Sequence, residues 1–262
     1  MRTPGKVEQL LLDRIREEGA IHLALIDPEE VPSDQMEPLA KILSEIDTRG
    51  VMVGGSTLAS TSQLDEVVRF LKGRLSLPLI HFPNSSTGIS RYADAIWFMS
   101  LLNSNNPLFI TGHQAMGAPL VKKYGLEAIP LGYIIVGEGS TAAYIGQAHE
   151  IPPKRSEVAG IYALAAQYIG MRFVYLEAGS GAEFPVPDEM IKYVSRMVDI
   201  PIIVGGGIKT PRDAEKAVRA GASIIVTGTI GERDVTGKRV KAIIQSIRDS
   251  ARSRGSAESA KD

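Results

Sequence analysis

One segment, residues 200–232, constrains the fold of this chain more than any other. It holds an apolar run at residues 200–204, three consecutive glycines, a helical pattern, and a second apolar run at residues 223–226 that is followed by Gly228 and Thr229. Short continuous apolar runs joined through a helix are typical of parallel strands that are buried on both faces. The carboxyl ends of the two strands are therefore expected to meet at one edge of a sheet.

Glycine-rich turns follow both of these strands. Gly205, Gly206 and Gly207 carry no Cβ, so their backbone N–H groups can approach an anion closely, and Gly228–Thr229 offers a second turn of this kind. Two such turns after the last two strands of a (β/α)₈ barrel form the usual phosphate site of that fold. The pair predicts a phosphate-binding site, whereas the triple glycine alone is equally suited to a tight strand-to-helix turn.

The rest of the chain repeats the alternation of apolar runs and helical patterns. Strands are expected at residues 22–26, 50–53, 78–82, 95–101, 127–136, 172–176, 200–204 and 223–226. An extra helical pattern precedes the first strand, and the turn-forming residues 83–88 predict that the third helix is missing or replaced by a loop. We therefore expect an α/β fold, a modified (β/α)₈ TIM barrel formed by residues 1–252 as a single domain, with a disordered tail at residues 253–262.

Composition argues against several other classes of protein. The formal net charge of −1 provides no general attraction for nucleic acid, and the absence of cysteine excludes disulfides and cysteine-ligated metals. Residues 95–121 lack charged side chains over a length sufficient to span a bilayer, but the polar residues 103–107 interrupt them. We expect a strand, a polar loop and a helix there, with no transmembrane segment. The first residues lack an apolar signal core, which predicts a cytoplasmic protein.

Potential metal ligands follow the first two predicted strands. Asp27 comes directly after residues 22–26 and precedes a proline. It is either a turn residue that accepts local backbone N–H bonds or a Mg²⁺ ligand, because a hard cation needs few protein oxygens when substrate phosphates complete its shell. Ser56 follows the second strand and is either a hydroxyl ligand or a simple helix N-cap.

A second acidic residue, Glu177, follows the sixth predicted strand and adjoins Gly179, Ser180 and Gly181. A partly desolvated carboxyl has a raised pKa, which suits a general base, although a surface or ion-paired glutamate fits the position as well. Tyr175 points to the same side of the strand as Glu177 and either shapes a pocket or fills the barrel. Ser180 and its backbone offer donors to a phosphate ester.

Other side chains have plainer interpretations. The histidines share no metal-ligand spacing and are interpreted as core or loop residues: His22, His81, His113 and His149. Lys209 is either a solvated residue at a helix start or a neighbour of the phosphate. Trp97 is expected to pack within the barrel or its helical layer.

Six short segments together carry a resemblance to a known family. They are residues 25–28 (LIDP), 53–57 (VGGST), 82–84 (FPN), 175–181 (YLEAGSG), 204–208 (VGGGI) and 226–229 (VTGT). In this order, over nearly the whole chain, they resemble the geranylgeranylglyceryl phosphate synthases. The resemblance implies a modified (β/α)₈ barrel that lacks the third helix, in agreement with residues 83–88.

The resemblance also implies an activity. It is the transfer of a geranylgeranyl group from geranylgeranyl diphosphate to the C3 hydroxyl of sn-glycerol 1-phosphate, in archaeal ether-lipid biosynthesis. By matching motifs, Asp27 and Ser56 would hold Mg²⁺ and Glu177 would accept the hydroxyl proton. The residues that would bind glycerol 1-phosphate are Tyr175, Leu176, Glu177, Ala178, Gly179, Ser180, Gly181, Gly206, Gly207, Gly228 and Thr229.

Further expectations concern the lipid chain and the assembly. The uncharged residues 95–102 and the helix near Ala115 are expected to line an apolar groove. The resemblance implies a homo-oligomer, a dimer or higher, and the insertion at residues 137–153 with Tyr144 is either its interface or a locally packed loop. Three alternatives stay open: a sister enzyme with another chain length such as heptaprenyl, a phosphosugar isomerase or lyase, and a non-catalytic barrel that binds a phosphate metabolite.

Overall fold

The computed structural model describes residues 3–57, 60–228 and 236–259, with side chains up to residue 255. Eight parallel strands close into one barrel in chain order, which confirms the expected fold. The strands are β1 (Ile21–Ile26), β2 (Val51–Val53), β3 (Leu79–His81), β4 (Ala95–Leu101), β5 (Glu127–Ile135), β6 (Phe173–Glu177), β7 (Ile202–Gly205) and β8 (Ile224–Thr227). Pairing of β1 with β8, from Ile21↔Ile224 to Ala24↔Thr227, completes the closure.

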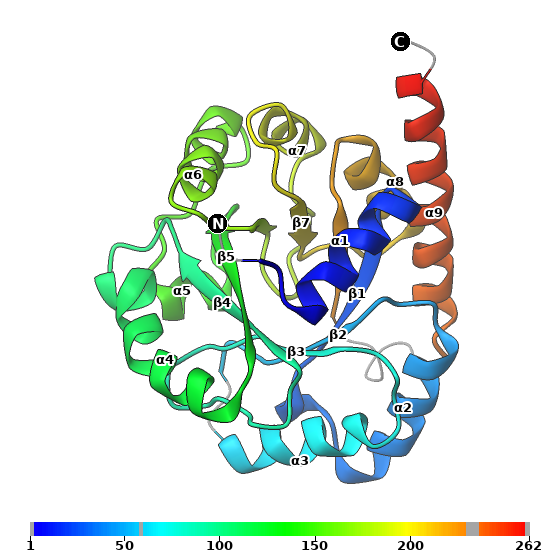
Figure 1. Cartoon of the computed structure of the whole chain (residues 1–262). Coiled ribbons are helices and arrows are strands. Elements are labelled where there is room, and N and C mark those ends of the chain that lie inside the picture. Colours follow the sequence, from blue (N-terminus) through cyan, green and yellow to red (C-terminus); the bar gives the residue numbers. More distant parts are fainter. Residues whose placement is uncertain (1–2, 58–59, 229–235, 260–262) are drawn as a thin grey trace.

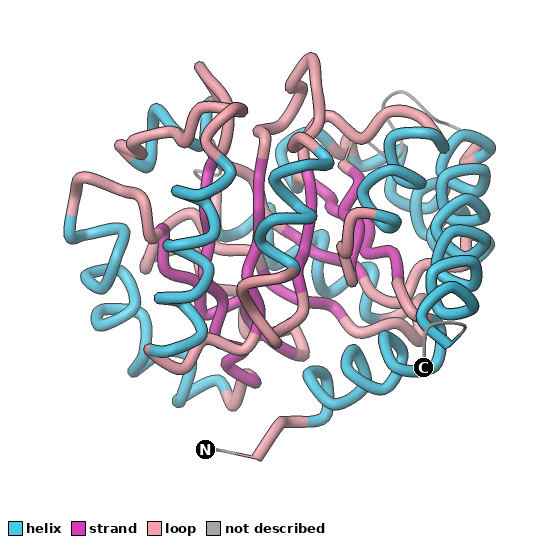
Figure 2. Tube along the Cα trace, turned by 90° about the horizontal axis from the view of Figure 1, so that it is seen from above, coloured by secondary structure: helices cyan, strands magenta, loops and turns pink. Residues whose placement is uncertain are grey.

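Helices surround the strands on the outside of the barrel (Figure 2). They are α1 (Lys6–Glu18), α2 (Met36–Glu45), α3 (Thr61–Lys72), α4 (His113–Tyr124), α5 (Thr141–Gly146), α6 (Ser156–Tyr168), α7 (Asp188–Ser195), α8 (Pro211–Arg219) and α9 (Lys238–Ser259). Residues 82–94 connect β3 to β4 without a helix. The prediction that the third barrel helix is missing is therefore confirmed.

Alternation along each strand separates the barrel interior from the layer under the helices. In β6, Phe173 and Tyr175 belong to the interior cluster, whereas Val174 and Leu176 belong to the outer cluster. This is the two-residue period of a strand. Trp97 also points inward and packs edge-on against Phe173 at a centroid distance of 5.3 Å, as expected from its apolar surroundings.

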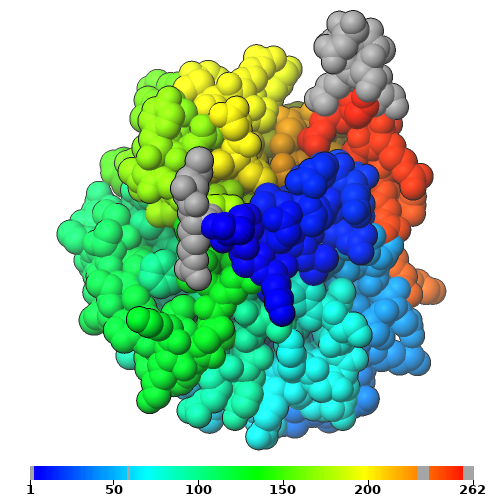
Figure 3. All heavy atoms as spheres, viewed as in Figure 1, coloured from blue at the N-terminus to red at the C-terminus, as the bar shows by residue number. Residues whose placement is uncertain are grey.

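Helix α1 closes the end of the barrel where the strands begin (Figures 1 and 3). The carboxylate of Glu127, the first residue of β5, accepts hydrogen bonds from the backbone N–H groups of Val7 and Glu8, both at 2.8 Å. These are the unsatisfied donors of the first helical turn. Leu11 of the same helix is fully buried in the interior cluster. The open end for chemistry is therefore the opposite one, where the strands end.

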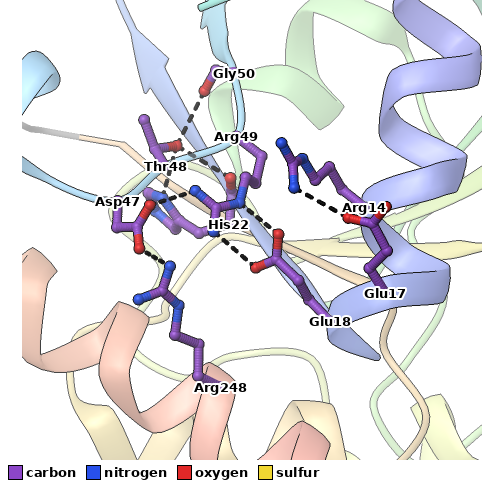
Figure 4. Close-up of polar contacts among 9 residues, drawn as sticks. All are labelled: Arg14, Glu17, Glu18, His22, Asp47, Thr48, Arg49, Gly50 and Arg248. Atoms are coloured by element: carbon purple, nitrogen blue, oxygen red, sulfur yellow. Dashed lines mark hydrogen bonds and ion pairs between the residues drawn. The ribbon is translucent and has the colours of Figure 1, made fainter.

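Ion pairs fasten this closed end to its neighbours (Figure 4). Arg49 binds both carboxylate oxygens of Glu18, the last residue of α1, at 2.6 and 3.0 Å. Arg49 also pairs with Asp47, which in turn pairs with Arg248 of α9. The network ties α1 and α9 to the loop that enters β2.

His22 lies beneath this network and has a structural role, as predicted. Its Nδ1 is 3.0 Å from the Thr48 hydroxyl and its Nε2 is 2.8 Å from the Thr227 hydroxyl. Burial lowers the pKa of His22 to about 3 because the charged imidazolium is poorly solvated there. The ring therefore stays neutral at physiological pH and serves as a hydrogen-bonded core residue.

The closing helix α9 is longer than its apolar pattern at residues 240–251 predicts. It continues through Ser259, into the segment for which the polar composition predicts a disordered tail. Arg254 explains part of this extension. Its guanidinium donates to the backbone oxygens of Val218, Ala222 and Gly19 at 2.8, 3.2 and 2.7 Å. A side chain that looks solvent-exposed in the sequence thus anchors α9 to two other parts of the barrel.

We expect Arg254→Ala to lower the free energy of unfolding by about 1.5–3 kcal/mol, the range for hydrogen bonds that involve a charged group. Urea denaturation measures this change, and Arg196→Ala is the control because Arg196 is exposed and makes no side-chain hydrogen bond or ion pair within the described residues. Equal losses in the two variants would show that Arg254 does not anchor α9.

The uncharged stretch at residues 95–121 forms β4, a π-helical turn (Leu108–Gly112) and the start of α4. The strand–loop–helix prediction for this stretch is therefore confirmed. Within the described residues, no helix has the length and apolar character needed to cross a bilayer. A separate, small cluster lies between β4 and the helical layer, and its buried residues are Ile89, Ile96, Val121 and Leu126.

Candidate active site

A cavity of about 270 Å³ opens where the strands end, at the face opposite α1. It brings together nine of the residues selected from the sequence: Asp27, Ser56, Tyr175, Glu177, Ser180, Gly181, Gly206, Gly207 and Gly228. The side chain of Leu176 instead points into the outer layer, and neither Ala178 nor Gly179 lines the cavity. Thr229 lies outside the described residues. The two predicted functional carboxylates thus share one cavity, although they follow distant strands.

Glu177 is the last residue of β6, and its side chain is buried at the cavity wall. The Gly179 N–H donates to Glu177 Oε1 at 2.6 Å. Burial raises the pKa of Glu177, because the ionised carboxylate is poorly solvated, and interactions with Tyr175 and the Gly179 N–H only partly oppose this. Glu177 is therefore not a surface residue, it makes no ion pair within the described residues, and its environment suits a general base.

Gly206 makes the burial of Glu177 possible. Its φ of +77° lies in the left-handed region, and a Cβ at this position would come within 2.5 Å of Glu177 Oε1. A side chain here would also collide with the backbone of Gly179, at 2.6 Å from its nitrogen. The second glycine of the triple is therefore required so that the β7 turn can pack directly against the carboxyl group.

Three aromatic rings line the cavity beside Glu177. Phe82, Tyr133 and Tyr175 lie in mutual contact, with centroid distances of 5.6, 5.9 and 5.3 Å. The Tyr175 hydroxyl makes no hydrogen bond of good geometry within the described part of the chain. Burial and the nearby Glu177 both raise the pKa values of Tyr133 and Tyr175, so both hydroxyls stay protonated. Sequence reasoning missed Tyr133, because its inward direction is visible only as part of the long apolar strand β5.

Asp27 has the turn role that its position in the sequence predicts. One carboxylate oxygen, Oδ1, accepts a hydrogen bond from the Glu29 N–H at 3.0 Å, so the turn interpretation is correct. The other oxygen lies against Gly55, where a Cβ would come within 1.9 Å of it. Desolvation raises the pKa of Asp27, and the negative charges of Glu30 and Glu29 raise it further. A cation beside Asp27 would relieve both effects.

Ser56 follows β2 and lines the cavity, but it does not begin a helix. Ser60, not Ser56, caps α3, because its hydroxyl accepts a hydrogen bond from the Gln63 N–H at 3.2 Å. The N-cap interpretation of Ser56 is therefore wrong. The Ser56 carbonyl accepts a hydrogen bond from Asn84 at 3.4 Å, which places the β3 loop beside it.

The oxygen atoms of Asp27 and Ser56 fit a hard cation whose coordination shell is completed by a bound ligand. Asp27 and Ser56 supply oxygen, and Glu30 lines the same wall. The described residues contain no group of three or more histidine, aspartate or glutamate side chains able to hold a metal by themselves. A metal here would therefore share its coordination shell with substrate oxygens.

The opposite end of the cavity is apolar. Its walls come from β4, the π-helical turn, α4 and α5, and include Ile96, Trp97, Met99, Leu101, Phe109, Gly117, Val121 and Ile145. These elements include both segments that the sequence suggested for an apolar groove. The cavity thus joins a polar region built from glycine turns and oxygen ligands to a region suited to a hydrocarbon chain.

Further polar side chains line the cavity, among them Lys209, for which the sequence left a position beside the phosphate open, and Arg239 and His113, which the sequence did not assign to the site. Lys209 follows the β7 turn, Arg239 lies in the first turn of α9, and His113 begins α4. His113 Nδ1 is 3.3 Å from the Ser86 hydroxyl, and partial burial lowers the pKa of this histidine. His113 thus lines the cavity, a position that its interpretation as a core or loop residue did not indicate. Its position in the short polar segment at residues 111–114 gave no signal of a cavity.

Comparison with known proteins places the chain among relatives of similar length. Residues 13–247 match the PcrB family. Geranylgeranylglyceryl phosphate synthase from Pyrococcus horikoshii is 50% identical over 245 residues, which cover 94% of this chain and 96% of that protein. The protein of the same name from Thermococcus gammatolerans is 53% identical over 229 residues, covering 87% of this chain and 90% of its own length.

A solved structure agrees in three dimensions. The (S)-3-O-geranylgeranylglyceryl phosphate synthase from Thermoplasma acidophilum, in complex with its substrate sn-glycerol-1-phosphate, superposes with a TM-score of 0.88 at 41% identity. The match covers 95% of this chain and 100% of that one. Because the family match and the relatives span most of the chain, the protein belongs to the PcrB family, together with the geranylgeranylglyceryl phosphate synthases that it resembles.

Proposed function

We propose that the protein transfers a geranylgeranyl group from geranylgeranyl diphosphate to the C3 hydroxyl of sn-glycerol 1-phosphate. The observation that carries this proposal is that one cavity has both a polar part and an apolar part. Glycine turns and the buried carboxyl of Glu177 occupy one side, the Asp27 carboxylate another, and apolar walls extend toward α4 and α5. The names of the relatives, which span most of the chain, support the same reaction.

Glycerol 1-phosphate is expected to lie at the ends of β6, β7 and β8. Ser180, Gly181, Gly206, Gly207, Gly228 and Thr229 would hold its phosphate, mainly through backbone N–H groups. Leu176, Ala178 and Gly179 would contribute only through the backbone, and Gly179 already orients Glu177. Held in this way, the C3 hydroxyl faces Glu177, which accepts its proton as the oxygen forms a bond to the allylic carbon.

The aromatic rings would stabilise positive charge on C1 of the prenyl group, the carbon that the hydroxyl oxygen attacks. Cleavage of the allylic carbon–oxygen bond leaves positive charge on C1 of the prenyl group, and aromatic faces attract such a charge. Phe82, Tyr133 and Tyr175 lie next to Glu177 and line the same cavity. We place C1 among these rings, with the hydrocarbon chain along β4 and α4.

A divalent cation, Mg²⁺ in this proposal, would be held by Asp27 and Ser56 and would offset the charge of the leaving diphosphate. Arg239 lines the same cavity and adds a positive side chain to it. The raised pKa of Asp27 supports the assignment, because the site favours a positive neighbour.

The protein is further proposed to be a cytoplasmic homo-oligomer, a dimer or higher. Tyr144 of α5 is 86% exposed, and Ile161 and Tyr168 of α6 and Ile169, which follows α6, are exposed as well. Exposed apolar residues that gather on one surface are typical of protein contacts. Light scattering during gel filtration measures the assembly, and a monomer at micromolar concentration would contradict it.

The activity is tested with purified protein, Mg²⁺, radiolabelled sn-glycerol 1-phosphate and a series of prenyl diphosphates. We expect a product that extracts into organic solvent, formed fastest from the geranylgeranyl donor. Fastest reaction with a heptaprenyl donor would assign the sister activity. Absence of product with every donor, from protein that is folded by circular dichroism, would reject prenyl transfer.

A further inference from the structure

Lys209 lies beside the glycine turns that are proposed to bind the phosphate. We call these turns the cradle; Ser180 and Gly181 form its β6 half, and Gly206 and Gly207 form its β7 half. Its side chain lines the cavity next to Gly206 and Gly207, and its Nζ donates to the carbonyl oxygen of Glu183 at 3.4 Å. The backbone of Lys209 is held in place from the other side, because its N–H donates to Asp213 of α8 at 3.1 Å. The ammonium group therefore reaches from the β7 turn across to the loop after β6.

The charge of Lys209 has no acidic partner within the described residues. The nearest carboxylate on the same turn, that of Asp213, is occupied by the capping box of α8. Its Oδ2 accepts from the Thr210 N–H and from the Thr210 hydroxyl, both at 2.8 Å. An ammonium group has three donor protons, and the Glu183 carbonyl uses one of them. Two donors and a full positive charge are thus left at the rim of an anion cradle.

The loop that Lys209 reaches covers the cradle directly. A Cβ at Gly207 would come within 2.6 Å of the backbone of Phe184 and Pro185, so these residues lie against the bare backbone of the β7 turn. The same loop begins with Ser180 and Gly181, which line the cavity. Its position therefore decides whether the β6 half of the cradle faces the β7 half.

We propose that Lys209 binds the phosphate of the acceptor substrate and, through the Glu183 carbonyl, holds the loop after β6 closed over it. This inference rests on the proposed function only for the identity of the phosphate ester. It makes Lys209 a determinant of acceptor affinity and leaves the proton transfer to Glu177. The loop and the lysine are expected to act together, since the ammonium can contact both at once.

The test compares Lys209→Met, Lys209→Arg and the control Lys216→Met, which removes an exposed lysine of the following helix, α8. For Lys209→Met we expect the KM for sn-glycerol 1-phosphate to rise about tenfold or more, as for the loss of a hydrogen bond to a charged group. The kcat at saturating acceptor and the KM for the prenyl diphosphate should change less than about twofold, because Lys209 binds the acceptor phosphate and takes no part in proton transfer. Lys209→Arg should restore most of the affinity, and Lys216→Met should behave as the unmodified protein.

A second measurement does not depend on turnover. Hydrogen exchange of residues 179–184 is followed with and without sn-glycerol 1-phosphate at a concentration that saturates each variant. The unmodified protein and Lys209→Arg should show slower exchange when the ester is bound, and Lys209→Met should show much less slowing. An unchanged KM in Lys209→Met, or equal slowing in all variants, would overturn the proposal. Absence of transfer in the unmodified protein would instead reject the proposed function. The exchange experiment would still test whether Lys209 binds the phosphate ester and holds the loop closed.

Discussion

Replacing Glu177 by glutamine is expected to lower turnover by about two to four orders of magnitude, the contribution typical of a general base. Glutamine keeps the shape of the side chain and an oxygen that can accept the Gly179 N–H, so the cradle should stay intact. The amide cannot accept the proton of the C3 hydroxyl. The KM for sn-glycerol 1-phosphate should therefore change little, because the phosphate contacts are unaffected.

The pH dependence of the reaction gives an independent test of Glu177. Burial raises the pKa of this carboxyl, so its proton is lost only above the ordinary glutamate range. Only the ionised form accepts a proton, and kcat should therefore rise with pH through the raised pKa. The residual activity of Glu177→Gln should lack this rise. Near-normal turnover in Glu177→Gln would remove Glu177 from the role of base.

The contribution of Glu177 to the stability of the fold should fall as pH rises, whereas kcat should increase. A carboxyl with a raised folded-state pKa favours folding in its protonated form, and this contribution is lost as pH rises through the folded-state pKa. Above its raised pKa, Glu177 thus adds an unfavourable buried charge to the unmodified protein, and glutamine lacks this charge. We expect Glu177→Gln to be at least as stable as the unmodified protein in urea denaturation at pH 7. A large loss of stability would attribute the low turnover to misfolding.

Replacing Asp27 by asparagine is expected to lower kcat/KM at a fixed Mg²⁺ concentration by about two orders of magnitude, because the cation would lose the charged ligand of the proposed pair, Asp27 and Ser56. Asparagine retains an oxygen that can accept the Glu29 N–H, so the turn after β1 should persist. Turnover measured against Mg²⁺ concentration should show a midpoint shifted to much higher concentration. Weaker binding of the diphosphate substrate should accompany this shift.

Asp34→Asn is the matched control, because Asp34 is exposed in the turn after Asp27 and makes no ion pair within the described ranges. It should leave the Mg²⁺ midpoint unchanged. An unchanged midpoint in Asp27→Asn would reject the ligand assignment and leave Asp27 as a turn residue. Lower pH should mimic the substitution, since protonation of Asp27 begins above the ordinary aspartate range.

The fold was predictable because its signals are local. Each apolar run is short and lies between turn formers, which favours a buried strand over a helix, and eight such runs leave few alternatives to a closed parallel barrel. The missing third helix followed from the turn formers at residues 83–88. The C-terminal helix was underestimated, because Arg254 is polar in sequence and acts through carbonyl groups of distant residues.

The site was predictable where it consists of backbone geometry. Gly206 and Gly207 adopt positive φ angles of +77° and +69°, which glycine tolerates and other residues rarely adopt. The side chains around this backbone were harder to assign. Arg239, Tyr133 and His113 come from three different elements, α9, β5 and α4, and no spacing along the chain indicates that they line one cavity.

By itself, the sequence determined the order of strands and helices, the glycine turns and the presence of Asp27 and Glu177 at strand ends, because these depend on neighbouring residues. Only the tertiary structure decided that Glu177 is buried against Gly206, that Asp27 shares its cavity, and that the apolar wall beside β4 continues from it. Burial and electrostatic environment arise from atoms that are distant in sequence. They exist only once the barrel has closed and brought those atoms together.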